Sequence, residues 1–288
     1  MGLVIVTDLD GTLLDPVTYE MGPALPVLQR VERAGIPLVL CSSKTRAEIE
    51  ALQQRLGISH PFIPENGGAI VAPAGYFRDV PPAAVVAGGR FVLELGRHYP
   101  EVVTILREVA AAERVRVVGF SDMTVSDVAA DCGLSALDAQ LAKLRQYDEP
   151  FTLCGADPAT RSRFLKALRR RGLRAVSGGR YDHAIGDADK GQAVAVLRTL
   201  FPEQPGPVVM AGLGDGLNDM SMLRAVDRPF IIRSDMNGAT SRLLRKVPTA
   251  LVTQASGPAG WAEAVTALLD GWQREVVRVR PRSWLGRS

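Results

Sequence analysis

The apolar positions of the chain form short continuous runs that alternate with amphipathic stretches. The runs at 3–7 and 36–41 are almost wholly apolar, which is typical of strands buried in a parallel sheet. The stretches at 22–34 and 45–56 repeat apolar residues at helical spacing. The same alternation returns near the end of the chain and predicts strands at 207–212 and 229–232 and helices at 217–225 and 259–271. Strands that alternate with helices indicate an α/β fold with a doubly wound, Rossmann-like parallel sheet.

The middle of the chain is organised differently. Residues 62–63 are a short apolar run, 64–71 predict a turn into a hairpin, and 73–89, rich in Ala, Pro and Gly, predict a linker. Beyond the linker the pattern predicts strands at 91–96, 115–119, 151–154, 174–177 and 181–185 and helices near 100–112, 124–131, 135–145 and 158–171. The domains expected from this pattern are a first part of the core at 1–82, an inserted α+β domain at 83–186, a second part of the core at 187–272 and a basic, flexible tail at 273–288.

Two carboxylates follow the first apolar run. Asp8 and Asp10 stand one residue apart, and Gly11 opens a loop after them. Ligands of open parallel sheets bind beyond the carboxyl ends of the strands, where this pair is expected. Carboxylates this close repel each other unless a cation or a proton separates them, and Mg²⁺ prefers such oxygen ligands. The alternative is an Asp-Gly turn in which one Asp caps a helix.

Other expected strand and helix ends also carry polar groups. One strand leads into hydroxyl and cationic side chains at 42–46, and another leads into the acidic, glycine-rich loop 212–219. Lys190 opens an amphipathic segment, and on its own it would be a solvated residue at a helix N-terminus. Glycines let backbone N–H groups approach a phosphate closely. Together these features predict a site for phosphate and a metal ion.

The first motif reads Asp8-Leu-Asp-Gly-Thr12 and the last reads Gly214-Asp-Gly-Leu-Asn-Asp219, about two hundred residues later. With the segments around Ser42 and Lys190, they make the chain resemble the haloacid dehalogenase superfamily of phosphohydrolases in all four of its motifs. The resemblance spans residues 3–256. It implies a Rossmann-like core with a large α+β cap inserted between the second and third motifs.

The resemblance also implies a role for each motif residue. Asp8 is the expected nucleophile, which forms an aspartyl phosphate. Asp10 is the expected acid and base, which protonates the leaving alcohol and then deprotonates water. The residues expected to bind phosphate are Ser42, Lys190 and Asn218. The expected Mg²⁺ ligands are Asp8, Asp10 through its backbone carbonyl, and Asp215, with Asp219 supporting them.

Segments 41–46, 120–123, 145–151 and 178–183 resemble those of one subfamily, the mannosyl-3-phosphoglycerate phosphatases. This resemblance implies hydrolysis of mannosyl-3-phosphoglycerate to mannosylglycerate and phosphate, a step in making a compatible solute. The residues expected to bind this phosphorylated sugar-glycerate are Ser43, Lys44, Arg46, Asp148, Glu149, Arg180 and His183. The chain departs from the subfamily at Gly216-Leu217, where Ser-Pro is more usual, and in its basic extension beyond about residue 272.

The chemistry of these side chains suits such a substrate, because cations hold carboxylates and acids accept hydrogen bonds from sugar hydroxyls. Each cap residue also has a simpler interpretation. Asp148 and Glu149 fit a solvated turn before Pro150, and His183 fits a histidine whose bonds are satisfied within the cap. Three other functions remain open: a broader sugar phosphatase that also accepts the glucosyl analogue or hexose phosphates, a phosphomutase, and a regulator that binds a phosphosugar without catalysis.

Composition narrows the partners. The formal net charge of +3 is too small to indicate a nucleic-acid partner, and there is no apolar run long enough for a membrane span. The three cysteines fit neither a disulfide framework nor zinc spacing, and no signal peptide is visible, so we expect the protein in the cytoplasm. We also expect a monomer or a homodimer. The arginine-rich segment from 274 onward predicts a flexible tail, with a contact to another subunit or to an anionic surface as alternatives.

Overall fold

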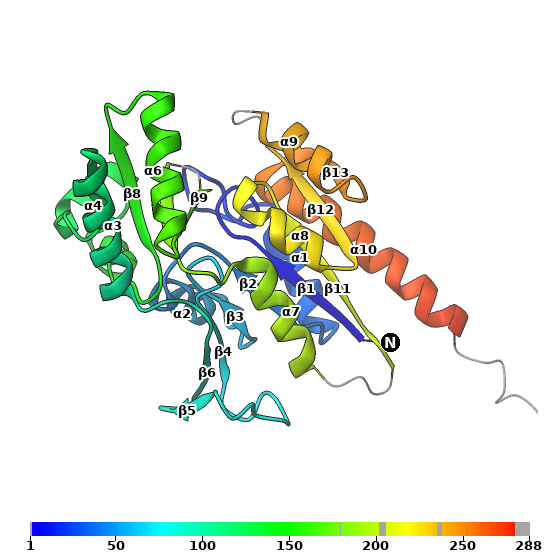
Figure 1. The fold of residues 1–288 in the computed structure, drawn as a ribbon. Coiled ribbons are helices and arrows are strands. Elements are labelled where there is room, and N and C mark those ends of the chain that lie inside the picture. The colour runs from blue at the N-terminus through cyan, green and yellow to red at the C-terminus, as the bar shows by residue number, and fades with distance from the viewer. Residues whose placement is uncertain (1, 179, 202–205, 235–237, 280–288) are drawn as a thin grey trace, which may run out of the picture.

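The computed structural model describes residues 2–178, 180–201, 206–234 and 238–279, without the side chains of 273–279 (Figure 1). Within these residues the larger sheet has nine strands, and its parallel part is built around the first strand of the chain. The parallel strands, in spatial order, are β13 (Leu251–Ser256), β12 (Arg228–Arg233), β11 (Val208–Gly214), β1 (Gly2–Thr7), β2 (Leu38–Cys41) and β3 (Phe62–Ile63). Chain order reverses at β1, so the sheet is doubly wound as predicted.

Antiparallel strands extend this sheet beyond β3. They are β4 (Ala69–Pro73), β6 (Arg90–Glu94) and β5 (Val85–Ala87). The sequence placed a strand at 91–96 in the inserted domain, and this placement was wrong, because β6 pairs with β4 in the large sheet. The segment expected to be a linker contains β5, which pairs with β6.

Helices cover both faces of the large sheet. Apolar side chains of α1 (Ala24–Arg33), α2 (Arg46–Leu56) and α10 (Gly257–Val279) pack in one core cluster, and those of α7 (Lys190–Leu200), α8 (Met220–Ala225) and α9 (Ala239–Lys246) pack in the other. The sequence sets the limits of α2 locally. Thr45 and Glu48 form a capping box at its start, and Gly57 ends it in the left-handed conformation.

The smaller sheet forms the cap and is antiparallel. Its spatial order is β7 (Arg116–Gly119), β8 (Glu149–Cys154), β10 (Tyr181–Ile185) and β9 (Arg174–Gly178). The helices α3 (Tyr99–Glu113) and α6 (Pro158–Arg170) bury apolar side chains in one cluster with this sheet. The helices α4 (Val125–Cys132) and α5 (Ala136–Ala142) contribute to a second cluster with Phe120 and Tyr181.

The fold class is confirmed, an α/β core with a second, smaller sheet as cap, and most predicted elements lie within a few residues of their observed limits. The sequence missed α9 and β13, and it merged a 3₁₀ turn at Leu217–Asp219 with the helix that follows. A flexible tail was expected at 273–288, but residues 273–279 belong to α10, which ends at Val279. Residues 280–288 lie outside the described residues. In the described part of the chain, no helix is long and apolar enough to cross a membrane.

Candidate active site

The parallel strands bring the sequence motifs together at one edge of the sheet. Thr7, the last residue of β1, pairs with Leu40 of β2 on one side and with Leu213 of β11 on the other. The segments that follow these strands therefore emerge side by side. They are the loop with Asp8, the loop 42–46 and the loop 214–219.

Three buried groups form the centre of this edge. The Lys190 ammonium donates to Oδ1 of Asp8 and to Oδ1 of Asp219, at 2.6 Å in both cases. Burial opposes the charge on Lys190, but the Asp219 and Asp8 carboxylates outweigh it and raise the lysine pKa above its ordinary value. Asp219 also accepts the backbone N–H groups of Asp215 and Gly216 through Oδ2. It thus anchors Lys190 and shapes the loop that carries Asp215.

Carboxylates outnumber cations in this cluster. One oxygen from each of Asp8, Asp215 and Asp219 lies within 4.8 Å of the others, whereas Lys190 supplies one positive charge. Burial raises the pKa of Asp8 well above its ordinary value, and burial together with Asp219 raises the pKa of Asp215 to about 7. Both shifts express the cost of buried charge that lacks a counter-ion. The donor set therefore suits a hard divalent cation, which prefers carboxylate oxygens.

Backbone shape allows the loops to approach. Gly11 has φ of 82°, and a Cβ there would lie 2.6 Å from Oδ2 of Asp215. Thr12 Oγ1 donates to Oδ1 of Asp215 at 3.1 Å. The Asp-Gly-Thr sequence after β1 thus serves the close contact between the first and last motifs, in addition to turning the chain.

Asp10 is only partly buried. Its Oδ2 pairs with Lys44 Nζ at 3.0 Å, whereas its Oδ1 is buried with no hydrogen-bond partner among the described residues. A carboxylate held by one oxygen, with the other unpaired, is suited to exchange a proton with a bound ligand.

The cap touches the core through a buried polar network. Glu65, in the turn after β3, accepts the backbone N–H groups of residues 146–148, and Asn66 donates to Oδ2 of Asp148 at 2.9 Å. Arg145 pairs with Asp148 and donates to the carbonyl of Ser43 in the loop 42–46. These contacts connect the cap to the loops that carry the motifs.

The structure places the sequence-predicted cap residues in different environments. Asp148 is buried, and its Oδ2 also contacts His183 Nδ1 at 3.1 Å. Glu149 is buried and accepts from Tyr99 Oη and the Ser121 N–H. These three side chains are therefore bonded within the protein, as the simpler interpretation of His183 expected, and the solvated turn suggested for the two acids was wrong. Arg180 is exposed on the turn between β9 and β10.

The residues predicted in the loop 42–46 and in the last motif also differ in their contacts. Ser42 directly follows β2, it is buried, and its Oγ accepts the Lys44 N–H. Arg46 pairs with Glu50 along α2 instead of with an acid of the cluster. Asn218 Nδ2 lies 3.5 Å from Oδ1 of Asn66 and so joins the last motif to the cap network.

Comparison with known proteins shows the family to which the chain is similar. The family model described as haloacid dehalogenase-like hydrolase matches residues 5–78. A relative from Methanococcoides burtonii, named glucosyl-3-phosphoglycerate/mannosyl-3-phosphoglycerate phosphatase, is 39% identical over 92% of this chain and 97% of its own. The chain belongs to the haloacid dehalogenase-like hydrolases. A second relative of the same name, from Persephonella marina, is 36% identical over 94% of this chain and 99% of its own.

Among solved structures, a haloacid dehalogenase-like hydrolase from B. subtilis superimposes with a TM-score of 0.65 at 19% identity. The match covers 93% of this chain and all of that one, so the fold of the whole hydrolase is shared. The resemblance to the haloacid dehalogenase superfamily found in the sequence is therefore confirmed, and the names of the two relatives include both the mannosyl and the glucosyl phosphatase.

The sequence missed several residues that shape the site of this hydrolase. Glu65 and Asn66 were taken only as part of a turn, yet both have positive φ and both are buried. A signal was present, because an acid and an amide followed by two glycines suggest a tight, close-packed loop. Tyr19 gave no such signal, because its partner Cys132 is distant in the sequence. Arg145 was noted only as the first residue of the segment 145–151, and its bond to the Ser43 carbonyl was not foreseen.

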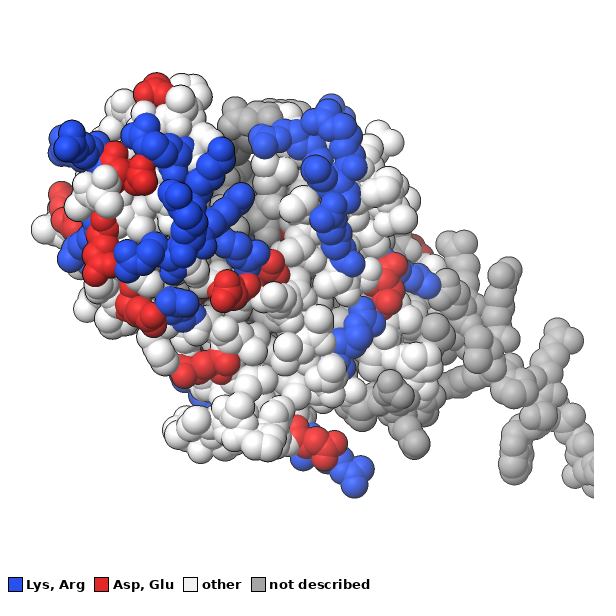
Figure 2. All heavy atoms as spheres, in the orientation of Figure 1, with Lys and Arg blue, Asp and Glu red and all other residues white. Residues whose placement is uncertain are grey.

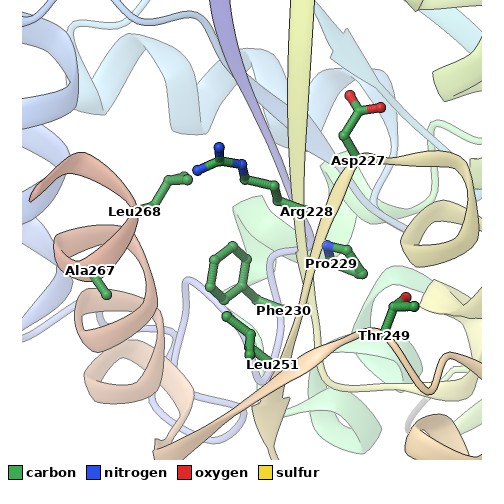
Figure 3. Close-up of a pocket in the computed structure, with 8 residues that line it drawn as sticks. All are labelled: Asp227, Arg228, Pro229, Phe230, Thr249, Leu251, Ala267 and Leu268. Carbon is green, nitrogen blue, oxygen red and sulfur yellow. The ribbon is translucent and has the colours of Figure 1, made fainter. Parts of the chain in front are cut away.

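A cavity of about 370 Å³ lies between β12, β13 and α10, lined by Arg228, Phe230, Leu251 and Leu268 among others (Figure 3). Arg228 is the first residue of β12, so the cavity opens at the amino ends of the parallel strands. The motif residues follow the carboxyl ends of these strands. The cavity is therefore separate from the acidic cluster.

Replacing Glu149 with Gln tests whether this carboxylate contributes to the stability of the fold or contacts the substrate. Burial raises the pKa of Glu149, so the folded state holds its proton more tightly than the unfolded state. The wild type should lose stability as pH rises from the unfolded to the folded pKa, and the neutral amide should not. We expect Glu149→Gln to melt at or above the wild-type temperature at pH 7, with a smaller gain at pH 4.

The matched control is Glu108→Gln, in an exposed pair with Arg171, which should change the melting temperature little at either pH. Thermal unfolding at both pH values checks the prediction. A Glu149→Gln variant that melts normally but has a strongly raised KM would show instead that the carboxylate contacts the substrate.

Proposed function

We propose that this phosphatase hydrolyses mannosyl-3-phosphoglycerate in a Mg²⁺-dependent reaction with an aspartyl-phosphate intermediate on Asp8. The observation that carries the proposal is the buried cluster of Asp8, Lys190 and Asp219 with Asp215 beside it. The names of two relatives at 36–39% identity support the substrate class, and they include the glucosyl analogue. We therefore keep glucosyl-3-phosphoglycerate as an alternative substrate of the same site.

In the proposed reaction these side chains act in two steps. An Asp8 oxygen forms a bond to phosphorus while the bond to the glycerate oxygen breaks, and Asp10 gives its proton to that oxygen. Water then attacks the phosphorus, Asp10 takes a proton from it, and the bond to Asp8 breaks to release phosphate. Lys190 holds the Asp8 carboxylate in place and offsets negative charge on the phosphoryl group.

Asp8, Asp215 and the Asp10 backbone carbonyl are the groups that would hold Mg²⁺, with Asp219 supporting them. When bound, the ion would offset the charge of the carboxylates and of the transferring phosphoryl oxygens. The raised pKa values of Asp8 and Asp215 support this assignment, because they mark carboxylates that lack a counter-charge.

The surface charge suits an anionic substrate. Figure 2 shows Lys and Arg side chains gathered over α6 on the cap and over α9 on the core. Many of the cap arginines pair with acids, as Arg163 does with Glu113 and Arg171 with Glu108. The α9 segment carries three further cations, Arg242, Arg245 and Lys246.

Phosphate release from a panel of substrates tests the proposal. The panel is mannosyl-3-phosphoglycerate, glucosyl-3-phosphoglycerate, mannose 6-phosphate and 3-phosphoglycerate, each with Mg²⁺ and with EDTA. We expect the first compound to have the highest kcat/KM, and EDTA to abolish turnover. Equal turnover of the two glycosyl compounds would favour the dual substrate, and equal turnover of mannose 6-phosphate would overturn the substrate assignment. No release from any compound would favour the binding regulator.

A further inference from the structure

Tyr19 connects the cap to the acid–base residue. It lies in the loop that follows the first motif, half-buried, and its Oη donates to the carbonyl of Cys132 at 3.4 Å. Cys132 is the last residue of α4 in the cap, where helix carbonyls lack partners within the helix. The phenol of a core residue thus satisfies the end of a cap helix.

The ring of Tyr19 makes a second contact on the core side. The Lys44 ammonium lies 4.8 Å from the ring centroid, at the distance of a cation–π contact. The same ammonium pairs with Oδ2 of Asp10 at 3.0 Å and lies 3.7 Å from Glu48. Tyr19 therefore limits where Lys44 can lie, and Lys44 in turn holds one oxygen of Asp10.

The loop around Tyr19 is built to hold this position. Asp15 accepts the N–H groups of Val17 and Thr18 through its side chain, and its carbonyl accepts the Tyr19 N–H. Tyr19 has φ of 58°, which is costly for a residue that is not glycine. Such strain is retained where the side chain must reach a particular place.

We propose that Tyr19 is a positioning residue, which couples docking of the cap at Cys132 to the orientation of Asp10 through Lys44. The proposal rests on the proposed function only in taking Asp10 as the acid that protonates the leaving alcohol. With Lys44 held under the ring, Oδ2 of Asp10 is occupied and the unpaired Oδ1 remains for the proton. Without the ring, Lys44 is free to move toward Glu48, and Asp10 loses its orientation.

The dependence of the rate on the leaving group distinguishes a positioning role of Tyr19 from a purely structural one. An alkyl phosphate has a poor leaving group and needs the acid, whereas p-nitrophenolate leaves readily without a proton. We expect Tyr19→Leu to lower kcat/KM, which reports formation of the phosphoenzyme, about 10-fold for the glycosyl-3-phosphoglycerates and less than about 2-fold for p-nitrophenyl phosphate. Leu is chosen because it has no branch at Cβ, so it adds little new strain at a positive φ.

Two further variants sharpen the test. Tyr19→Phe keeps the ring and should restore kcat to near the wild-type value, with a raised KM because the bond to Cys132 is lost. Lys44→Met should reproduce the selective loss, and the double variant should lose no more than Lys44→Met alone, since both changes act on one path. Tyr76→Phe removes a hydroxyl that contacts His60 instead of the cap, and it should leave the kinetics unchanged.

Equal losses of kcat/KM on both kinds of substrate, or additive losses in the double variant, would overturn the proposal. Failure of the proposed substrate is separate: if the wild type hydrolyses only other alkyl phosphates, the comparison is run with the best of them. A wild type that hydrolyses p-nitrophenyl phosphate but no alkyl phosphate would overturn both the proposed function and the proposed role of Tyr19. Melting temperatures of all variants, measured in parallel, identify any loss that comes from unfolding.

Discussion

Replacing Asp8 with Asn is expected to abolish turnover, with a fall in kcat on the order of 10⁴-fold or more. The amide has the shape of the carboxylate but is not a nucleophile, so the aspartyl phosphate cannot form. The fold should persist, because Lys190 keeps its bond to Asp219. Phosphate release measures the loss, and trapping of the phosphoenzyme by acid quenching distinguishes the wild type from the variant.

A matched control is available on the same sheet. Asp227 precedes β12 at the opposite edge, where it pairs with Arg198 and accepts the Met210 N–H. Asp227→Asn should therefore keep wild-type kinetics. Turnover by Asp8→Asn within about 10-fold of the wild type would exclude Asp8 as nucleophile.

Replacing Lys190 with Met is expected to lower the free energy of unfolding by about 3–5 kcal/mol in metal-free buffer. The ammonium is about 1% exposed and has two carboxylate partners, and its removal leaves both buried without their shared cation. A divalent cation should recover part of this loss, because it supplies positive charge to the same oxygens. Urea unfolding with EDTA and with Mg²⁺ measures both effects.

Arg171→Met serves as the control, because its pair with Glu108 is about half exposed on both sides and should contribute less than about 1 kcal/mol. A change of similar size in the two variants would show that Lys190 is not the main counter-charge of the cluster. Activity of Lys190→Met is expected to be lost as well, since the lysine also holds Asp8, the proposed nucleophile.

Strands were predicted best from the sequence where their side chains are apolar and buried on both faces of the sheet. The run at 3–7 is continuous in apolar residues because β1 lies between β2 and β11 with both faces covered, so it was recognised without any tertiary information. The strand β13 was missed because residues 251–256 mix apolar and polar side chains at the sheet edge, and Leu251 is exposed. Edge strands have weaker patterns, since only part of their surface is buried.

The motif residues of the core and the residues of the cap also differ in how far the sequence predicts their positions. Motif residues sit next to their strand ends, and parallel strands bring such ends to one edge by geometry alone. The cap residues depend on where an inserted domain docks. Asp148 was predicted to bind the substrate, with a solvated turn as the alternative, and neither interpretation included the docking against Asn66 that buries it beside Arg145 and His183.

The sequence by itself therefore determined the doubly wound core, the inserted α+β cap and the family, because these follow from apolar periodicity and from motifs of adjacent residues. Tertiary structure alone decided the pairing of β6 with the core sheet, the network from Glu65 to Asp148, and the contact of Tyr19 with both Cys132 and Lys44. These contacts join residues far apart in the chain. Their partners are selected by the docking of complete elements, which no local pattern of residues records.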